Sequence, residues 1–299
     1  MVNGFSLISL VQLGTVDYAT GLRLQQQLAG LRKAEKIGDV LLLLEHSPVI
    51  TLGRNAKATN VIASPELLAQ RGVELFECDR GGDVTFHGPG QIVGYPIFDL
   101  RSFAAPDGKR KTLGAVDFVR RLEEVLIRTC ADFTIPTKRV PGLTGVWTDP
   151  QSEPSPDLSF RAEKNDSQNR SLESRNLLSA GAATNPSPEA KLAAIGVHIS
   201  RFVTSHGFAL NVNTDLSYFN LIIPCGITSK PVTSMQQELD KPLDLNAVAE
   251  AISRNVGTVF SSQILWVETL DALLGHAVGV PLQHPAELRQ MHKEDTFWS

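Results

Sequence analysis

The sequence predicts one domain that mixes helices and strands, and three observations support this. Apolar runs of strand length recur along the chain, for example at residues 40–44 and 91–100. Apolar residues at helical spacing occupy other stretches, such as 245–259. Residues 148–190 show neither period and are rich in Ser, Pro, Asn, Asp and Glu, so we expect a disordered insertion within one domain.

The first half of the chain predicts a helix followed by strands. Residues 20–34 carry Leu22, Leu28 and Leu31 at roughly helical spacing. The continuous apolar run 40–44 predicts a buried strand, and a second apolar stretch, 48–52, stops at Gly53. Residues 91–100, QIVGYPIFDL, are rich in β-branched and aromatic residues and predict another strand.

The second half predicts two helices and a strand pair. Residues 112–128 place four apolar side chains on one helical stripe, namely Val116, Val119, Leu122 and Val125. After the insertion, KLAAIGVHIS (191–200) and HGFALNV (206–212) predict strands joined by a turn at 201–205. A last helix is predicted from the helical spacing of Leu245, Val248, Ile252, Val256 and Val259.

Composition allows a folded enzyme and excludes two classes of partner. The chain has 299 residues, and 42% of them are hydrophobic, which suffices for a sizeable core. A formal net charge of −4 provides no basic face for nucleic acid. Because no apolar stretch is long enough to span a bilayer, we expect neither nucleic acid nor membrane as partner.

The cysteines favour a reducing compartment. Cys78, Cys130 and Cys225 are odd in number and none pairs closely in sequence, so neither a disulfide framework nor a zinc motif is indicated. Cys78, at a strand end, and Cys130, at a helix end, are interpreted as structural. The first Arg is Arg23, so the N-terminal segment shows no clear targeting signal.

A glycine-rich segment, RGGDVTFHGPGQ at 80–91, directly precedes a predicted strand. Glycine lets the backbone approach a ligand closely and adopt positive φ. The spacing matches neither the phosphate loop nor the dinucleotide fingerprint, and an ordinary hairpin connection is an equally open interpretation. Arg80 and His87 favour a site, because they flank the tight backbone and their side chains would be aimed into whatever the loop surrounds.

Two further residues are weak signals when taken alone. Cys225 stands between Pro224, whose φ is fixed, and Gly226, whose φ is free, which can present a sulfur at a turn. A lone cysteine is more often a small buried hydrophobe than a nucleophile. Lys191 stands where the polar insertion meets a strand, and a lysine at a strand edge is more often solvated than functional. The histidines show no metal-binding spacing, so no metal site is expected at His46, His87, His198 or His206.

Taken in order, RGGDVTFHGPGQ, KLAAIG, HGFALNV and PCGI resemble the octanoyltransferase family, the lipoate-protein ligase B type of lipoyl(octanoyl) transferase. The resemblance covers the chain from about Leu10 to Ser262 apart from the insertion. It implies an α+β fold of mixed β-sheets with flanking helices, similar to the catalytic domain of lipoate and biotin protein ligases. The domain is then expected at 1–265, interrupted at 148–190, with an extension of unassigned role at 266–299.

The same resemblance implies the site. Cys225 would accept the acyl group and Lys191 would lie beside its sulfur, with no cofactor and no metal. The implied substrate-binding residues are Arg80, Gly81, Gly82, Asp83, Val84, Thr85, Phe86, His87, Ala194, Ile195, Gly196, Gly207, Phe208 and Ala209. An ammonium beside a thiol lowers the thiol pKa, and Lys191 would afterwards act as general base.

The implied reaction moves an octanoyl group from octanoyl-acyl carrier protein to a lysine ε-amine on lipoyl domains. Such acceptors would be 2-oxoacid dehydrogenase E2 subunits and the glycine cleavage H protein. Exchange between thioesters is nearly isoenergetic and amide formation runs downhill, so ATP is not required. An ATP-dependent lipoate-protein ligase and a catalytically silent binding protein are the alternatives. The Ser-rich insertion favours the mitochondrial matrix as compartment, with the cytoplasm as the alternative.

Overall fold

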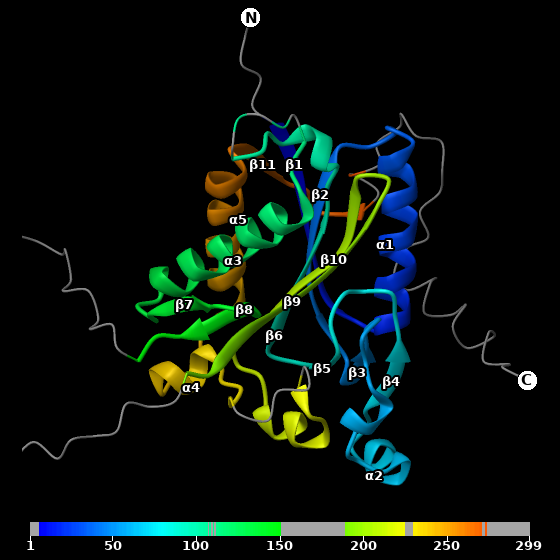
Figure 1. The fold of residues 1–299 in the computed structure, drawn as a ribbon, viewed down its shortest axis with the longest axis vertical. Helices are drawn as coiled ribbons and strands as arrows, with labels where there is room; N and C mark the ends of the chain where they lie inside the picture. The colour runs from blue at the N-terminus through cyan, green and yellow to red at the C-terminus, as the bar shows by residue number, and fades with distance from the viewer. Residues whose placement is uncertain are drawn as a thin grey trace, which may run out of the picture.

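The computed structural model describes residues 6–106, 108, 110, 112–150, 189–224, 230–270 and 273, and Figure 1 shows a twisted sheet with helices on both sides. This large sheet has eight strands in the order β11-β1-β2-β6-β10-β9-β8-β7. β1 pairs in parallel with β2 and β11, while the remaining neighbours are antiparallel. The bounds are β1 Ser6–Val16, β2 Asp39–His46, β6 Gln91–Ile97, β7 Thr137–Val140, β8 Leu143–Thr148, β9 Lys191–Ser200, β10 Val203–Asn211 and β11 Ser262–Trp266.

A second sheet of three strands, in the order β4-β3-β5, lies at the lower end of the large sheet in Figure 1. Its strands are β3 Val49–Leu52, β4 Glu74–Glu77 and β5 Val84–His87. Helix α2, Pro65–Gln70, connects β3 to β4 together with the 3-10 turn η1, Ala58–Asn60. Ser64 starts α2 because its side chain accepts a hydrogen bond from Leu67 N. The aromatic side chains of a later 3-10 turn, η3 Leu216–Leu221, pack on Phe86 of β5.

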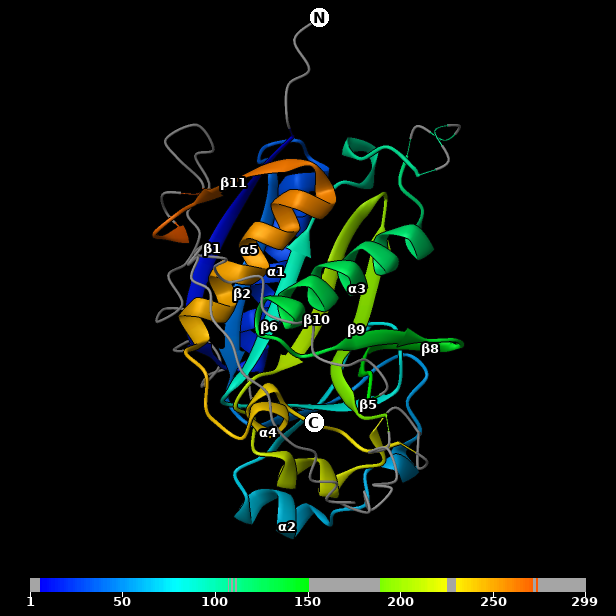
Figure 2. The same cartoon turned by 90° about the vertical axis from the view of Figure 1, so that its left-hand side faces the viewer.

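Helices cover both faces of the large sheet. α1, Tyr18–Lys33, covers one face, and α3, Ala115–Asp132, and α5, Leu245–Phe260, lie side by side on the other (Figures 1 and 2). Asp17 caps α1 by accepting from Thr20 N, and Asp244 caps α5 by accepting from Asn246 N. The short elements α4, Met235–Leu239, and η2, Leu100–Ser102, complete the described fold.

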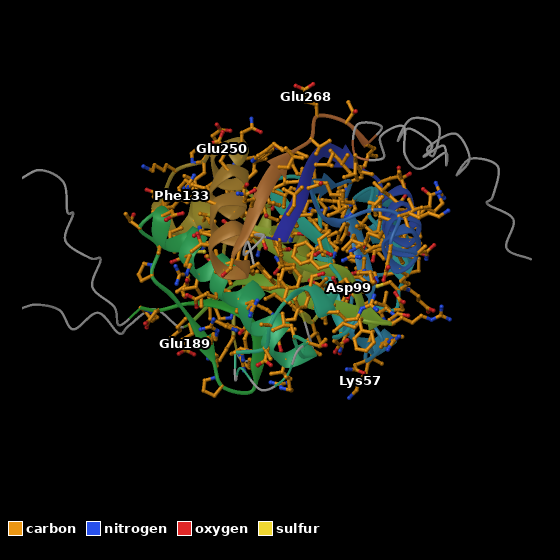
Figure 3. The ribbon with its side chains drawn as sticks, turned by 90° about the horizontal axis from the view of Figure 1, so that it is seen from above. Lys57, Asp99, Phe133, Glu189, Glu250 and Glu268 are labelled. Atoms are coloured by element: carbon orange, nitrogen blue, oxygen red, sulfur yellow. The ribbon has the colours of Figure 1, made fainter. Side chains whose placement is uncertain are left out.

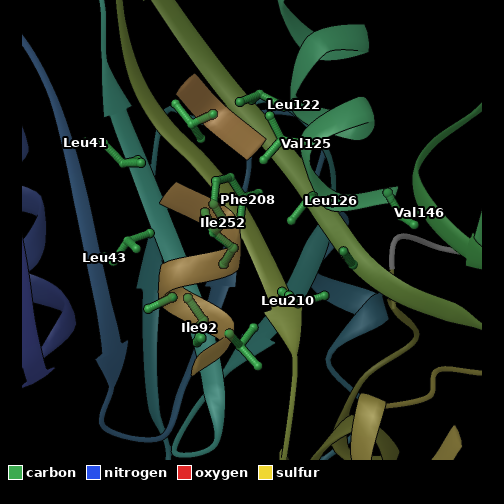
Figure 4. Packing of buried hydrophobic residues seen from close by; sticks show 14 of the residues in the cluster. Leu41, Leu43, Ile92, Leu122, Val125, Leu126, Val146, Phe208, Leu210 and Ile252 are labelled. Atoms are coloured by element: carbon green, nitrogen blue, oxygen red, sulfur yellow. The ribbon is translucent and has the colours of Figure 1, made fainter. Parts of the chain in front are cut away.

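Strand β2 explains why its sequence is a continuous apolar run. Successive side chains of a strand point to opposite faces, and here both faces are covered. Leu41 and Leu43 pack under α3 and α5, as Figure 4 shows, whereas Leu42 and Leu44 pack towards α1. Each fully buried leucine stabilises the fold by about 1.5–3 kcal/mol relative to an exposed one. The predicted buried strand is therefore confirmed.

The predicted elements are confirmed in type, but two details were wrong. Val116 does not share the buried stripe of α3; its side chain is 72% exposed, and Phe118, Leu122 and Val125 face the core instead. The turn between β9 and β10 is shorter than the predicted 201–205, because β10 already begins at Val203. Arg201 and Phe202 both adopt positive φ, as a two-residue hairpin turn requires, although neither is glycine.

The ends of the predicted insertion meet at one point of the sheet. Thr148 N donates to Ala190 O, and Ala190 N donates to the Thr148 hydroxyl, each at 2.9 Å. Glu189 lies at the margin of the molecule when it is seen from above (Figure 3). Residues 151–188 lie outside the described residues, so the chain leaves and rejoins the domain between β8 and β9.

The start of the predicted extension belongs to the fold. Trp266 ends β11, Val267 N donates to Leu10 O at 2.8 Å, and Leu270 is buried near α1. Residues 271, 272 and 274–299 lie outside the described part of the chain, so the role of the extension stays open. Within the described residues, no helix is both long and apolar enough to cross a membrane.

Candidate active site

A cavity lies where the small sheet packs against the large one. Strands β6, β9 and β10 form its floor, β5 forms the opposite wall, and Tyr18 at the start of α1 contributes to its lining. The side chains that line it are mostly apolar or small. They belong to Tyr18, Arg80, Thr85, His87, Val93, Tyr95, Ala194, Gly196, His206, Gly207, Phe208 and Ala209.

The floor of this cavity is a stripe of small residues, which we call the small-residue stripe: Ala194, Gly196, Gly207 and Ala209. Gly196 pairs with Gly207 and Ala194 pairs with Ala209 across β9 and β10. Gly196 also permits a close approach, because a Cβ there would lie 2.6 Å from the carbonyl oxygen of Gly81. The stripe leaves a narrow apolar space that suits an unbranched chain.

The glycine-rich loop is held in place by Arg80. Its guanidinium donates to the hydroxyl and carbonyl oxygens of Thr51 and to the carbonyl oxygens of Gly81 and Asp83. Its side chain lines the cavity, but its donors are directed at the loop and β3, because a buried guanidinium must have its donors satisfied.

The His87 imidazole is the centre of a hydrogen-bond chain. Gln91 donates through its amide nitrogen to Phe86 O and Asn211 Oδ1, so its oxygen accepts from His87 Nδ1 at 2.7 Å. Nε2 then carries the lone pair and faces the Thr51 hydroxyl at 3.5 Å. Burial, reinforced by the nearby charges of His46 and Arg80, lowers the pKa of His87 to about 3. The imidazole is therefore neutral at physiological pH.

Several aromatic and histidine side chains of the cavity were not predicted. Tyr95 donates to His46 Nε2 at 2.6 Å, because His46 Nδ1 is occupied by the carbonyl oxygen of Val16. Burial lowers the pKa of His46 to about 4. Tyr18 stacks against His87 with ring centroids 6.3 Å apart. These residues lie in no glycine-rich motif, and only the tertiary fold brings them to the cavity.

His206 adds a strained position to the cavity wall. It adopts a φ of 55° although it is not glycine, and its Nε2 lies 2.7 Å from Asp79 Oδ1. Its backbone N donates to Gln25 Oε1 at 2.7 Å. Left-handed φ at a bulky residue is uncommon and requires such local restraint. Its motif was noted in the sequence, but the strain could not be inferred from it.

A second, small cavity contains Lys191 and shares Thr85, Ala194 and Ala209 with the first. Pro224, which directly precedes Cys225, lines the same cavity. Val232, on the other side of the cysteine loop, lines it as well and bridges to Lys191. Both flanks of the cysteine loop therefore lie at the cavity that holds Lys191, next to the small-residue stripe.

The Lys191 ammonium is buried rather than solvated. Its side chain is only 8% exposed, and Nζ lies 5.3 Å from the centre of the Trp147 ring. Its backbone is fixed on both sides, since Lys191 N donates to Pro231 O at 2.8 Å and Thr233 N donates to Lys191 O at 3.0 Å. The interpretation of Lys191 as a solvated edge residue is therefore excluded.

The other predicted site residues have different places. Cys225 lies outside the described residues. Val84 and Phe86 point away from the cavity into the core of the small sheet, and Ile195 packs against the core under α3. Gly81, Gly82 and Asp83 form the loop itself: Gly81 N donates to Val197 O, Gly82 O accepts from Asn55 N, and the Asp83 carboxylate accepts from Asn60 and from two backbone N–H groups.

The remaining cysteines have structural surroundings. Cys130 is fully buried at the end of α3, and burial raises the pKa of its thiol to about 12. A thiol with that pKa is not a nucleophile at neutral pH. Cys78 directly follows β4 and is half-buried; its thiol donates to Leu52 O at 3.4 Å. Neither side chain lines either cavity.

Residues 17–257 match the family model described as the lipoyl protein ligase A/B catalytic domain. The octanoyltransferase of Koribacter versatilis is 54% identical over 97% of this chain and 98% of its own length. The chain belongs to the octanoyltransferase family. The octanoyltransferase of Acidobacterium capsulatum is 52% identical over 90% of this chain and 96% of its own length. The resemblance drawn from the four motifs is therefore confirmed.

Solved structures confirm the predicted α+β fold. A bi-partite lipoate protein ligase from Thermoplasma acidophilum superposes with a TM-score of 0.60 at 12% identity, covering 97% of this chain and 93% of that one. A lipoate-protein ligase A bound with ATP gives a TM-score of 0.56 at 10% identity, covering 97% of this chain and 95% of that one. At these identities the likeness is one of fold.

Proposed function

We propose that the chain transfers an octanoyl group from octanoyl-acyl carrier protein, through a thioester on Cys225, to a lysine ε-amine of lipoyl domains. Membership of the octanoyltransferase family makes it an acyltransferase of protein lipoylation. The carrier-protein donor and the glycine cleavage H protein as an acceptor go beyond that membership. The observation that carries the proposal is the shared cavity of Lys191 and Pro224, which adjoins the small-residue stripe.

The geometry suits a two-step exchange. The Cys225 thiolate attacks the donor carbonyl, the bond to the carrier sulfur breaks, and that sulfur leaves as a thiol after taking a proton. Next, the lysine amine attacks the new thioester, a C–N bond forms, and the Cys225 sulfur leaves. Lys191 supplies positive charge beside the thiolate and gives its proton to the leaving carrier sulfur. As a neutral amine it then accepts the proton of the attacking lysine amine.

The small-residue stripe provides room for the acyl chain. An octanoyl group has seven carbons beyond its carbonyl, and at about 0.8 kcal/mol per buried CH₂ they contribute roughly 5 kcal/mol to binding. No charged side chain is needed along such a chain. His87 is neutral, and the Arg80 guanidinium, although charged, has its donors bound by Thr51, Gly81 and Asp83.

An ATP-dependent ligase is the alternative, since ligases share the fold. In that reaction the glycine-rich loop would bind an acyl-adenylate. Arg80 is the only cationic residue of the segment 80–91, and its donors are committed to Thr51, Gly81 and Asp83. This arrangement favours the transferase.

Intact-mass measurement after mixing the protein with octanoyl-acyl carrier protein, without ATP, tests the proposal. We expect a single octanoyl adduct that disappears in Cys225→Ser and persists in the matched control Cys78→Ser. Transfer to a lipoyl domain should follow when that domain is added. Octanoylation of the lipoyl domain that requires ATP and free octanoate, without an adduct on the enzyme, would instead establish a ligase.

The compartment is a separate proposal. The assignment to the mitochondrial matrix rests on the Ser-rich insertion alone. The named relatives are bacterial and do not support this assignment. The cytoplasm is the alternative. Fractionation of the source cells decides between them: recovery in the cytosol alone would overturn the matrix.

A further inference from the structure

Glu123 is a fully buried acid on α3, with 0% exposure. The neighbouring buried residues of that helix, among them Leu122 and Leu126, are apolar. Acidic residues are almost never fully buried unless they are paired, because desolvation disfavours the charge. The partners of Glu123 therefore show what its carboxylate contributes.

All three partners of the carboxylate donate to it. Oε2 accepts from Arg120 Nη1 at 2.6 Å and from Arg139 Nε at 3.1 Å. The two arginine side chains are 49% and 36% exposed, so their charges reach Glu123 from the solvent side. Oε1 accepts from the backbone N of Gly145 on β8, at 3.2 Å. This bond is the one that leads inward, towards the site.

Gly145 lies against the side chain of Lys191. Its φ is 125°, and a Cβ at this position would lie 2.9 Å from Lys191 Cε and 2.5 Å from the carbonyl oxygen of Ala193. The pairing of β8 with β9 shifts register between Val146 and Trp147, next to this point. The alkyl chain of Lys191 thus passes over the Gly145 backbone, with the Trp147 ring beside its ammonium.

We propose that Glu123 is a positioning residue for Lys191. Its carboxylate holds the Gly145 backbone, and the Gly145 backbone determines where the Lys191 side chain runs towards the cavity lined by Pro224. The inference rests on the proposed function of Lys191. An apolar residue would fill the same space in α3 without requiring Arg120 and Arg139, but it would offer no acceptor to Gly145.

Glu123→Gln tests this inference with little change of shape. Because Arg120, Arg139 and Gly145 all donate, a glutamine cannot satisfy both sides: its NH₂ group must face either the arginines or Gly145. Its oxygen will face the two cations, and Gly145 N loses its acceptor. We expect kcat to fall roughly 10-fold to 100-fold with little change in KM, since misplacement of a catalytic group by about 1 Å has effects of that size.

The control and the readouts separate positioning from stability. Glu124→Gln is the matched control, because Glu124 also accepts from Arg139, at 2.9 Å, whereas Gly145 N donates to Glu123. The pH dependence of Cys225 alkylation, with Cys78 and Cys130 replaced, should shift to higher pH in Glu123→Gln and not in Glu124→Gln. In a Lys191→Ala background, Glu123→Gln should cause no further change in either readout.

Distinct outcomes identify what fails. A Glu123→Gln protein with a lower melting temperature but unchanged kcat and alkylation profile would overturn the inference, as would an equal loss in the Lys191→Ala background. If Lys191→Ala itself leaves kcat and the profile unchanged, the proposed role of Lys191 fails and the inference with it. Should Glu123→Gln not fold, Arg139→Gln removes one of the two cations from the surface and should shift the profile in the same direction.

Discussion

The floor of the acyl cavity, on β9 and β10, carries small side chains, whereas the opposite wall, on β5 and its preceding loop, carries polar ones. On the floor, Gly196 and Ala194 pair with Gly207 and Ala209, and the absence of long side chains at these four positions creates the space. On the wall, Thr85 and His87 face the same space. One side of the cavity is thus defined by volume and the other by hydrogen bonds.

The difference shows how polar groups can border an alkyl chain. From Arg80 the bonds run to Thr51, from Thr51 to His87, and from His87 through Gln91 to Asn211. Each of these groups has a protein partner, so their hydrogen-bonding capacity is satisfied within the protein. The small-residue stripe needs no such chain, because its glycines and alanines have no polar side chain to satisfy.

A larger side chain in the floor of the cavity should have the largest effect on stability and activity. In Gly196→Val, the new Cβ would lie 2.6 Å from a backbone oxygen, Gly81 O, which cannot rotate away. The glycine-rich loop must move, and we expect a loss of about 3 kcal/mol in the free energy of unfolding, with activity lost as well. Urea unfolding and acyl transfer measure both. Gly38→Val is the control, since nothing lies within 4 Å of a Cβ there; equal losses in both variants would contradict the account.

Removing a hydrogen bond from the wall should destabilise the protein less than filling the floor. Thr51→Val removes the hydroxyl that accepts from Arg80 Nε at 3.1 Å and leaves that buried donor without this partner. We expect destabilisation of about 1–2 kcal/mol and a higher KM for the acyl donor, because the loop loses an anchor. Thr51→Ser keeps the hydroxyl and should behave like the wild type. A serine variant as impaired as the valine variant would show that the hydrogen bond alone does not account for the role of Thr51.

Periodicity predicted the elements of the fold but not every side of each element. The runs of β2 and β6 and the spacing of α5 were sufficient, because both sheet faces are buried and apolar. Val116 was misplaced because the helical stripe of α3 continues through Phe118, which lies two residues later and is equally apolar. The turn after β9 was predicted, but its two-residue length was not, because the sequence offers no glycine to mark the positive φ of Arg201 and Phe202.

The site residues that lie in sequence motifs could be predicted, whereas those that only tertiary packing brings to the site could not. Glycine-rich segments marked the loop and the stripe, and the resemblance supplied Lys191, whose burial no local pattern indicates. Tyr18 and Tyr95 reach the cavity from separate elements, and His46 lies behind Tyr95, so no spacing links them. Glu123 stands beside Glu124 in the sequence like an ordinary solvated pair, and only the contacts of α3 with β8 distinguish the two.

Titration should affect the wall and not the floor. Burial lowers the pKa of His87 to about 3 and of His46 to about 4, from 6.5. Above about pH 6.5 both histidines are neutral in the folded and unfolded chain. Below it the unfolded chain binds protons that the folded chain does not, so stability falls as the pH drops towards 4.

We expect each of these histidines to contribute a slope of about 1 kcal/mol per pH unit in that window. His87→Asn keeps a donor towards Gln91 but does not titrate, and it should reduce the slope by that amount. Urea unfolding at a series of pH values measures it. A slope unchanged in His87→Asn would mean that His87 protonates normally in the folded protein.

The mildest change, Ala194→Val, should alter selectivity while leaving stability within about 0.5 kcal/mol of the wild type. Ala194 is half-buried and faces both cavities, and valine is well suited to a strand. The two added methyl groups occupy volume in the stripe without meeting backbone at once, in contrast to Gly196→Val.

A narrower stripe should penalise the longer acyl chain, so the ratio of kcat/KM for octanoyl to hexanoyl donors should fall roughly tenfold, a typical value for one or two methylenes in an apolar pocket. Competition between the two carrier-protein donors, followed by the mass of the acyl-enzyme, measures this ratio directly. An unchanged ratio with lowered rates for both donors would place the acyl chain elsewhere and leave the stripe with a packing role.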